Sequence, residues 1–225
     1  MTSRPHVLLS VAMSVDGYID DVRDARLMLS NDEDLDRVDE VRAGVDAILV
    51  GANTIRRDNP RLLVRSPARQ EERVRRGLAA HPLKVTLTGR GDLDVAAQFF
   101  SAGDSGKLVY TCDSVATALR EKLGVAATVV AAGEPIDVGA VLDDLGEREV
   151  ERLMVEGGGT IHTQFLAAGL VDEIHLVIAP FLVGDAGAPR FAYPGRFPQD
   201  PEHPMTLAEI RQMGNVVLLR YLVAG

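Results

Sequence analysis

One segment of the chain combines side chains that can bind an anion with residues typical of a tight loop. The segment Gly51–Arg65 reads GANTIRRDNPRLLVR and follows a short apolar run. Its Asn53 and Thr54 carry hydrogen-bonding groups suited to a small ligand, and Arg61 or Arg65 can form paired bonds to a phosphate. The segment therefore predicts an anion-binding loop. The arginines that follow it, between 69 and 76, fit the commoner pattern of a solvated helix face.

Asp58 is the acidic member of this segment. It can orient a sugar hydroxyl or transfer a proton, which are the tasks of a general acid or base. A structural explanation is also available, because Asp58-Asn59-Pro60 is typical of an Asx-Pro turn whose side chains bond their own backbone. The two interpretations are compatible, so Asp58 is a candidate catalytic residue.

A second candidate segment, Glu156 to Thr160, reads EGGGT and lies between an apolar run and a helical pattern. Three successive glycines let the backbone approach a ligand closely, and the next helix offers N–H groups to a phosphate. The spacing is not GxGxxG, so a standard dinucleotide-binding fold is not predicted. The glycines alone fit a tight strand-to-helix turn equally well. Glu156 favours a ligand site, because open α/β sheets bind ligands at the carboxyl ends of their strands.

The residues that other kinds of catalytic site require are missing. The histidines at positions 6, 81, 162, 175 and 203 show no metal-ligand spacing, so we expect no metal site. There is no GxSxG nucleophile motif and no Walker loop. The single cysteine, Cys112, cannot supply the cysteine pair of a zinc deaminase, and we expect it to end a strand as a small buried residue.

Composition limits the compartment and the partners. The 225 residues carry a formal net charge of −9, which disfavours nucleic acid and anionic membranes as partners. No apolar run reaches the roughly 18 residues of a membrane span, and the first ten residues hold too short an apolar run for a signal peptide. A single cysteine agrees with a reducing compartment. We therefore expect a soluble cytoplasmic protein.

Apolar runs alternate with helical patterns along nearly the whole chain. Ser30 and Glu33 have the spacing of a capping box in front of the first helix, on which Leu35, Val38 and Val41 share one face. We expect a loop without secondary structure from the end of the strand 45–51 to about residue 66. The predicted strands are 6–13, 45–51, 83–88, 107–111, 126–131, 151–155 and 171–179, with a final hairpin of 206–212 and 215–223. The predicted helices are 32–43, a charged helix from 66 to about 78, 113–123, 137–145 and 160–168.

This alternation predicts the α/β class and a doubly wound, mostly parallel mixed sheet with helices on both faces. The Gly214-Asn215 pair between the last two runs predicts a C-terminal antiparallel hairpin. No repeat, low-complexity tract or linker interrupts the pattern. We therefore expect a single domain over residues 1–225.

Taken together, the segments resemble a known family. VAMSVDG (11–17), DAILVGANTIRRDNPRLLVR (46–65), PLKVTLT (82–88) and MVEGGGTIHTQFLAAGLVDEIHLVIAPFLVG (154–184) occur in the order seen in the reductase domain of bacterial riboflavin-biosynthesis proteins. The related stand-alone pyrimidine reductases share this pattern. The resemblance covers nearly the whole chain and implies a dihydrofolate-reductase-like fold.

The resemblance also implies an activity and a set of roles. The reaction it implies is hydride transfer from NADPH to C1′ of a ribosylaminopyrimidine 5′-phosphate, giving the ribityl product. It makes Asp58 and Glu156 the candidate catalytic residues. The residues it assigns to the substrate are Ser10, Ser30, Arg61, Leu62 and Arg65. Those it assigns to NADPH are Gly51, Ala52, Asn53, Thr54, Gly157, Gly158, Gly159 and Thr160.

The sequence departs from the family pattern in two places. Many bacterial members have a lysine where this chain has Ser10, and Met28-Leu29 replaces the usual Trp-Ile before Ser30. We expect the chain to act without the fused deaminase domain of the bifunctional members. Two other functions stay open: a dihydrofolate- or pteridine-type reductase on the same fold, and a non-enzymatic NADPH-binding protein. The resemblance further implies a homodimer.

Overall fold

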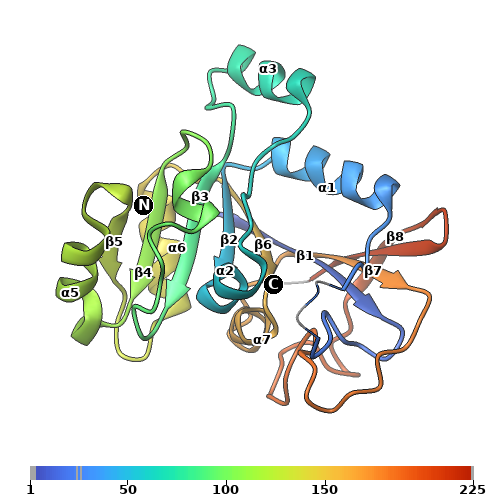
Figure 1. The fold of residues 1–225 in the computed structure, drawn as a ribbon. Helices are drawn as coiled ribbons and strands as arrows, with labels where there is room; N and C mark the ends of the chain where they lie inside the picture. The colour runs from blue at the N-terminus through green and yellow to red at the C-terminus, as the bar shows by residue number, and fades with distance from the viewer. Residues whose placement is uncertain (1–3, 24, 26, 224–225) are drawn as a thin grey trace. The chain divides into compact units, whose positions relative to one another are not determined.

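Nine strands form a mixed sheet in the computed structural model, which describes residues 4–23, 25 and 27–223 (Figure 1). Their hydrogen-bonded order is β5-β4-β3-β2-β6-β1-β7-β9-β8. The strands are β1 (His6–Ser14), β2 (Ala47–Gly51), β3 (Leu83–Thr88), β4 (Lys107–Thr111), β5 (Thr128–Ala131), β6 (Arg152–Gly157), β7 (Glu173–Ala179), β8 (Thr206–Met213) and β9 (Val216–Leu222). The helices are α1 (Asp32–Ala43), α2 (Ala52–Asp58), α3 (Pro67–Arg75), α4 (Gln98–Ser101), α5 (Asp113–Leu123), the 3-10 turn η1 (Gly124–Ala126), α6 (Val138–Glu147) and α7 (Gly159–Ala167).

The described chain divides into two compact units, and each is discontinuous in sequence. The first unit holds residues 4–5 and 39–154, and the second holds 6–38 and 155–223. The chain passes from one unit to the other at the start of β1, within α1 and within β6, and none of these crossings is a Gly- or Pro-rich linker. That position explains why composition shows no boundary. The single domain expected over 1–225 stays a prediction.

The first unit is built on four parallel strands, β2 to β5, that neighbour one another in chain order. All five residues of β2 are buried, as are all but the first residue of β3 and of β4. Such continuous burial is typical of parallel strands covered on both faces. Two helices of this unit begin at side-chain caps: Ser66 accepts a bond from the Arg69 amide, and Asp137 accepts bonds from the Gly139 and Ala140 amides.

The second unit pairs β1 with β7 in parallel and β7 with β9 antiparallel, and β8 completes a hairpin with β9 (Figure 1). Gly214 adopts a left-handed φ of 58° in the hairpin turn. On one face of this hairpin, Val177, Met213, Val216 and Leu218 form an apolar cluster against which Ala12 packs. The predicted α/β class, mixed sheet and C-terminal antiparallel hairpin are confirmed.

Two local predictions are wrong. Residues 52–58, expected to be loop, form α2, because β2 runs directly into a helix at Gly51. The cap of α1 is Asn31 rather than Ser30: the Asn31 side-chain oxygen accepts the Asp34 amide at 3.0 Å. The capping box is therefore displaced by one residue, and Asp34 rather than Glu33 occupies the third helical position.

The buried side of α1 also differs from the apolar face expected for it. Leu35, Val38 and Val41 are only half-buried, whereas three charged residues, Asp34, Arg37 and Asp39, are fully buried. Their charges have partners: Arg37 donates to Asp34 at 2.8 Å, and Asp39 accepts from the loop that precedes α3. Cys112, expected to be buried, is half-buried at the start of α5.

None of the helices in the described residues is long and apolar enough to cross a membrane. Lys84 is a charged side chain that the first unit encloses completely. It is fully buried in β3, and its ammonium group donates to the carbonyls of Phe99 at 3.1 Å and Ala102 at 2.6 Å. Burial, with a smaller contribution from Lys107, lowers the pKa of Lys84 to about 8. Lys84 thus binds the last carbonyls of α4 without a carboxylate partner.

This depressed pKa predicts a stability that rises with pH. The unfolded chain binds the Lys84 proton more tightly, so between pH 8 and pH 10.5 the free energy of unfolding increases, by about 3 kcal/mol over the window. Urea unfolding of the wild type and of Lys84→Met at both pH values measures the difference. The wild type gains stability relative to the variant as pH rises. An identical pH dependence in the two proteins contradicts the assignment.

Candidate functional site

In the first unit, the predicted cofactor residues lie where β2 becomes α2. Gly51 is the N-cap of α2 in an extended conformation, with φ −72° and ψ 152°. Gly51 and Ala52 are buried, Thr54 is half-buried and Asn53 is exposed. The side chains of Asn53 and Thr54 are therefore the ones this turn presents outward, and Gly51 and Ala52 contribute backbone.

Asn59, rather than an Asx-Pro turn, ends α2. It adopts a left-handed φ of 44°, and its amide donates to the carbonyl of Ile55. The Asn59 side-chain oxygen accepts the Gln98 amide at 2.7 Å instead of bonding its own backbone. Arg61 Nε donates to the Gln98 side-chain oxygen at 2.6 Å. Gln98 thus fixes the chain on both sides of Pro60, and Asp58 is exposed at the last turn of the helix.

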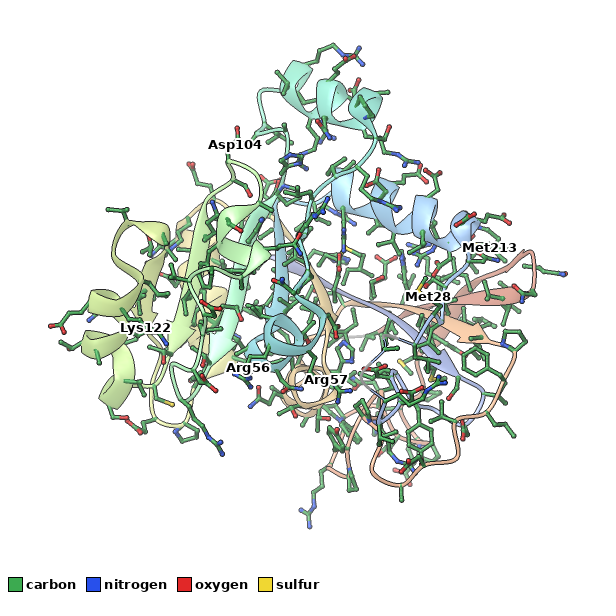
Figure 2. All side chains as sticks on the ribbon, viewed as in Figure 1. Met28, Arg56, Arg57, Asp104, Lys122 and Met213 are labelled. Carbon is green, nitrogen blue, oxygen red and sulfur yellow. The ribbon has the colours of Figure 1, made fainter. Side chains whose placement is uncertain are left out.

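Arg56 and Arg57 project from α2 (Figure 2). Arg56 donates to the carbonyl of Asp92 at 2.9 Å, and its second terminal nitrogen lies 3.5 Å from the Asn53 side-chain oxygen. Arg56 therefore joins the first turn of α2 to the loop that follows β3.

Of the three predicted substrate residues in this unit, Leu62 is placed differently from the two arginines. Its side chain is 2% exposed in the core of the unit, with a left-handed φ of 52°. Contact with a ligand at Leu62 is therefore restricted to its backbone. Arg61 and Arg65 are exposed.

Asp39 organises the backbone around Arg65. It accepts hydrogen bonds from the amides of Arg65 and Ser66 and, at 3.0 Å, from the guanidinium of Arg69. Burial by itself raises the pKa of Asp39, but these donors outweigh it and hold that pKa below its usual value. Arg65 Nε lies 3.6 Å from the same carboxylate. The ionised carboxylate keeps the Arg65 guanidinium close to the start of α3.

In the second unit, the glycine segment carries β6 into α7. Glu156 is half-buried at the carboxyl end of β6, as predicted from the sequence. Gly157 has a φ of 149°, the peptide bond to Gly158 is cis, and Gly158 is the N-cap of α7. Thr160, in the first turn of the helix, is exposed.

Gly159 is required by packing within this unit. A Cβ atom at Gly159 would lie 2.1 Å from the carbonyl oxygen of Arg190, so the backbone of residues 189–193 lies directly against α7. We refer to residues 189–193 as the strap. The Tyr193 amide donates to Thr163 Oγ1 at 2.9 Å, and the His162 ring nitrogen Nδ1 is 3.1 Å from the carbonyl of Phe191. Burial lowers the pKa of the enclosed His162 to about 4, so the ring is neutral near pH 7.

The other side of the strap is bound to the turn after β1. The Phe191 amide donates to the carbonyl of Gly17, and the Ile19 amide donates to the carbonyl of Pro189. Arg190 donates to the hydroxyl of Tyr18 at 2.7 Å, and its guanidinium lies 4.5 Å from the centre of the same ring. The strap therefore links the first turn of α7 to the Asp16-Gly17 turn, two sites distant in sequence.

Asp16 gives the VAMSVDG segment a structural role. It accepts bonds from the Ser14 hydroxyl and from the amides of Val183 and Gly184. The Ser14 bond, helped by these amides, lowers the pKa of Asp16. The turn after β1 is thus fixed to the chain that follows β7.

Ser10 lies beside a network of charged groups that the sequence did not reveal. Ser10 is buried in β1, and its partner in the parallel register is His175 of β7. His175 Nε2 is 2.8 Å from a Glu173 oxygen, and Arg37 of α1 lies 3.1 Å from His175 Nδ1. Because Arg37 has only N–H donors, Nδ1 accepts its bond and the proton of a neutral His175 lies on Nε2.

Glu173 has two further partners, Arg220 and His6. The His175 bond first, then Arg220 and His6, lower the pKa of Glu173 well below its usual range, against the effect of burial. The residues of this network lie on β1, β7, β9 and α1, and no sequence spacing relates them. Their proximity can be recognised only from the folded structure.

Ser30 is half-buried, one residue before the cap of α1, and lies between the buried residues Leu29 and Asp34 in the sequence. Met28 is exposed (Figure 2).

In the described ranges, no group of three or more His, Cys, Asp or Glu side chains is placed to hold a metal ion. The predicted cofactor residues lie at two strand ends: the start of α2 after β2, and the start of α7 after β6. A mixed α/β sheet with an antiparallel hairpin at its C-terminus is the architecture of the dihydrofolate-reductase-like proteins.

The family model for the RibD C-terminal domain matches residues 5–219. The chain belongs to this family, as the sequence motifs predicted. It is 36% identical over 188 residues to the 2,5-diamino-6-ribosylamino-4(3H)-pyrimidinone 5′-phosphate reductase of Archaeoglobus fulgidus, covering 83% of this chain and 85% of that protein. The protein of the same name from Methanothermobacter thermautotrophicus is also 36% identical, over 82% of each chain.

Solved structures agree on the fold. A pyrimidine reductase-like protein from Corynebacterium diphtheriae superposes with a TM-score of 0.80 at 22% identity, covering 98% of this chain and 92% of that one. The riboflavin biosynthesis reductase Rib7 of Saccharomyces cerevisiae superposes with a TM-score of 0.70 at 18% identity, covering 98% and 90%.

Because the strap lies so close to Gly159, adding one methyl group at this position is expected to lower the stability of the protein. Gly159→Ala places its Cβ against the Arg190 carbonyl, which is backbone and has little freedom to move, so the free energy of unfolding falls by about 1–3 kcal/mol. Urea unfolding measures the change. Gly89→Ala is the matched control, because its Cβ would meet nothing nearer than the Cys112 sulfur at 3.8 Å. Equal stabilities of the two variants contradict the packing role.

The Glu173 network predicts an acid-sensitive stability. A carboxyl with a lowered folded pKa stabilises the protein above its unfolded pKa of about 4.3, and this contribution is lost as pH falls below that value. Glu173→Gln therefore lowers the free energy of unfolding at pH 7, by about 2–3 kcal/mol, and reduces its decline between pH 4.5 and pH 2.5. Glu72→Gln, which breaks an exposed pair with Arg75, serves as control in the same urea titrations. A wild-type decline no steeper than that of Glu173→Gln refutes the prediction.

Proposed function

We propose that this chain is a reductase that converts a ribosylaminopyrimidine 5′-phosphate into its ribityl form with NADPH as hydride donor. The observation that carries the proposal is the 36% identity to the Archaeoglobus fulgidus reductase, which extends over most of both proteins. The substrate in that relative's name, 2,5-diamino-6-ribosylamino-4(3H)-pyrimidinone 5′-phosphate, is therefore the first candidate. The deaminated uracil counterpart is the second.

The glycine segment of the second unit fits the phosphates of a nicotinamide cofactor. Gly157 holds a φ that only glycine adopts readily, and Gly159 has no room for a side chain, so the segment offers backbone alone. It ends at the first turn of α7, where amides point toward the N-terminus of the helix. The strap keeps this turn in place. In the first unit, Asn53 and Thr54 are the side chains that face outward where β2 becomes α2, and they are proposed as cofactor ligands.

In the proposed reaction the cofactor supplies a hydride, and residues of the chain bind the substrate and deliver a proton. NADPH, when bound, supplies the hydride that C1′ of the opened sugar accepts. Asp58 is exposed at the end of α2, where it is suited to deliver the proton that the former ring oxygen takes as it becomes a hydroxyl. Arg61, Arg65 and Ser30 bind the 5′-phosphate, and Ser10 lies toward the sugar. Glu156 provides a second carboxylate on the substrate side.

Further features support the cofactor's compartment and the assembly. A single half-buried thiol, Cys112, suits the reducing cytoplasm in which NADPH is abundant. We propose a homodimer as the working form. The net charge of −9 argues for a small-molecule substrate over nucleic acid.

The decisive experiment follows NADPH oxidation with three substrates: the diamino pyrimidinone phosphate, its uracil counterpart and dihydrofolate. We expect turnover of one or both ribosylaminopyrimidine phosphates and none of dihydrofolate, which has no 5′-phosphate for Arg65 to bind. Turnover of dihydrofolate alone identifies a folate-type reductase instead. NADPH binding without turnover of any of the three identifies a non-enzymatic binding protein.

Arg65→Ala tests the phosphate assignment. Loss of a charge-assisted bond raises KM for the phosphorylated substrate about 10- to 100-fold and leaves KM for NADPH unchanged. Arg76→Ala removes another exposed arginine, beyond the end of α3, and serves as the matched control. Steady-state kinetics of both variants decide the point. A similar rise in both, or a rise confined to NADPH, contradicts the role of Arg65.

A further inference from the structure

Tyr193 is an exposed aromatic residue of the strap to which the proposed reaction gives no task. Its side chain is 38% exposed, and it directly precedes Pro194. In the part of the chain that the structure describes, its hydroxyl has no hydrogen-bond partner. A single exposed aromatic residue is ordinary on a protein surface. Its meaning therefore depends on where its ring and its hydroxyl lie.

The backbone of Tyr193 is fixed to α7 one turn inside the helix. The Tyr193 amide donates to Thr163 Oγ1 at 2.9 Å, and the same Thr163 hydroxyl donates to the carbonyl of Gly159 at 2.7 Å. Pro194 adds a restriction, because a proline disfavours helical backbone angles in the residue before it. The point from which the Tyr193 side chain starts is therefore determined by its neighbours.

From that point the side chain runs back toward the beginning of α7. The Tyr193 amide is bonded at Thr163, whereas the ring carbon Cε2 would lie 3.0 Å from a Cβ atom at Gly159, the first residue of the helix. The hydroxyl is attached to the ring carbon next to Cε2, so it lies at the far end of the ring. The phenol group therefore lies beside the first turn of α7, at the end of the helix where the amides have no partner within the helix.

The groups at this end of α7 are neutral hydrogen-bond donors. The first turn offers backbone amides and the positive end of the helix dipole, the exposed Thr160 offers a hydroxyl, and Tyr193 adds a second one. Arg190 of the strap is already engaged, because it donates to the Tyr18 hydroxyl at 2.7 Å and its guanidinium lies over the same ring. Neutral donors at a helix N-terminus are the groups that bind the diphosphate of a dinucleotide.

We propose that Tyr193 is a further binding residue for the nicotinamide cofactor, and that its hydroxyl donates a hydrogen bond to the cofactor's diphosphate at the start of α7. This inference rests on the proposed function, which assigns the diphosphate to the glycine segment. The strap then has two tasks. Its backbone fills the space beside Gly159, and its last residue supplies a donor to the ligand.

Tyr193→Phe removes the hydroxyl alone and keeps the ring. Because this hydroxyl bonds no residue in the described ranges, the variant without ligand should be as stable as the wild type. Loss of a hydrogen bond to a charged diphosphate raises the dissociation constant of the cofactor about 10-fold. Isothermal titration calorimetry with NADP⁺ and with NADPH measures this constant, and urea unfolding without ligand measures the stability. We expect the same rise for both redox forms, because they share the diphosphate.

Tyr221→Phe is the matched control, because it removes another phenol hydroxyl of the second unit, on β9, and should leave both dissociation constants unchanged. Three results overturn the role of Tyr193: an unchanged dissociation constant in Tyr193→Phe, a rise confined to one redox form, or a loss of stability without ligand.

The proposed function fails in a different measurement. A wild type that binds the cofactor but reduces none of the three substrates refutes the reaction, and the dissociation constants of Tyr193→Phe still decide the role of its hydroxyl. A wild type that binds neither NADP⁺ nor NADPH overturns the inference together with the cofactor on which it rests.

Discussion

A single buried carboxylate, Glu173, holds together the second unit of this protein. Its oxygens join β7 to β9 through Arg220 and to the start of β1 through His6, and His175 carries the connection on to Arg37 of α1. A buried carboxylate is costly unless it is paired and hydrogen-bonded, so these contacts favour the register and orientation in which Glu173 keeps all its partners. Ser10 lies beside this network, because its register partner is His175, whereas Asn31 at the start of α1 is fixed separately by its bond to the Met213 carbonyl.

Around α7, contacts of the backbone hold the neighbouring segments together. The strap reaches the helix where Gly159 leaves space for a carbonyl, and it reaches the turn after β1 through Gly17 and Tyr18. A glycine segment is flexible by itself, and these contacts order the turn before α7. The phosphate binding proposed for this turn would then not include the cost of ordering it. The surrounding side chains, His162 and Thr163 among them, provide that order.

Sequence patterns located the elements best where burial is continuous on both faces. The runs 83–88 and 107–111 match β3 and β4 residue for residue, because their hydrophobic residues are bounded by clear turn signals. The helix α2 was not predicted, because its seven residues end at Asp58 and are followed by Asn59-Pro60. The run Asp-Asn-Pro is typical of a loop, although Asn59 forms the helix end. The apolar residues of α1 gave a wrong prediction of its buried face. The side that is buried carries paired charges, and some of their partners come from distant segments. The glycine and arginine segments were visible as motifs, whereas Arg37, His175 and the strap depend on register and loop packing that spacing does not encode.

The parallel pairing of β1 with β7 sets an order of events during synthesis. The Val7 amide bonds Asp172, 165 residues further along the chain, so the first strand made has no neighbour until most of the protein has left the ribosome. At about 5–20 residues per second the wait is roughly 8–33 s. The strands β2 to β5 are completed in that interval. A nine-residue apolar strand exposed for that time is a natural substrate for a chaperone, and heterologous expression at low temperature, which slows aggregation of such a strand, should improve the yield of folded protein.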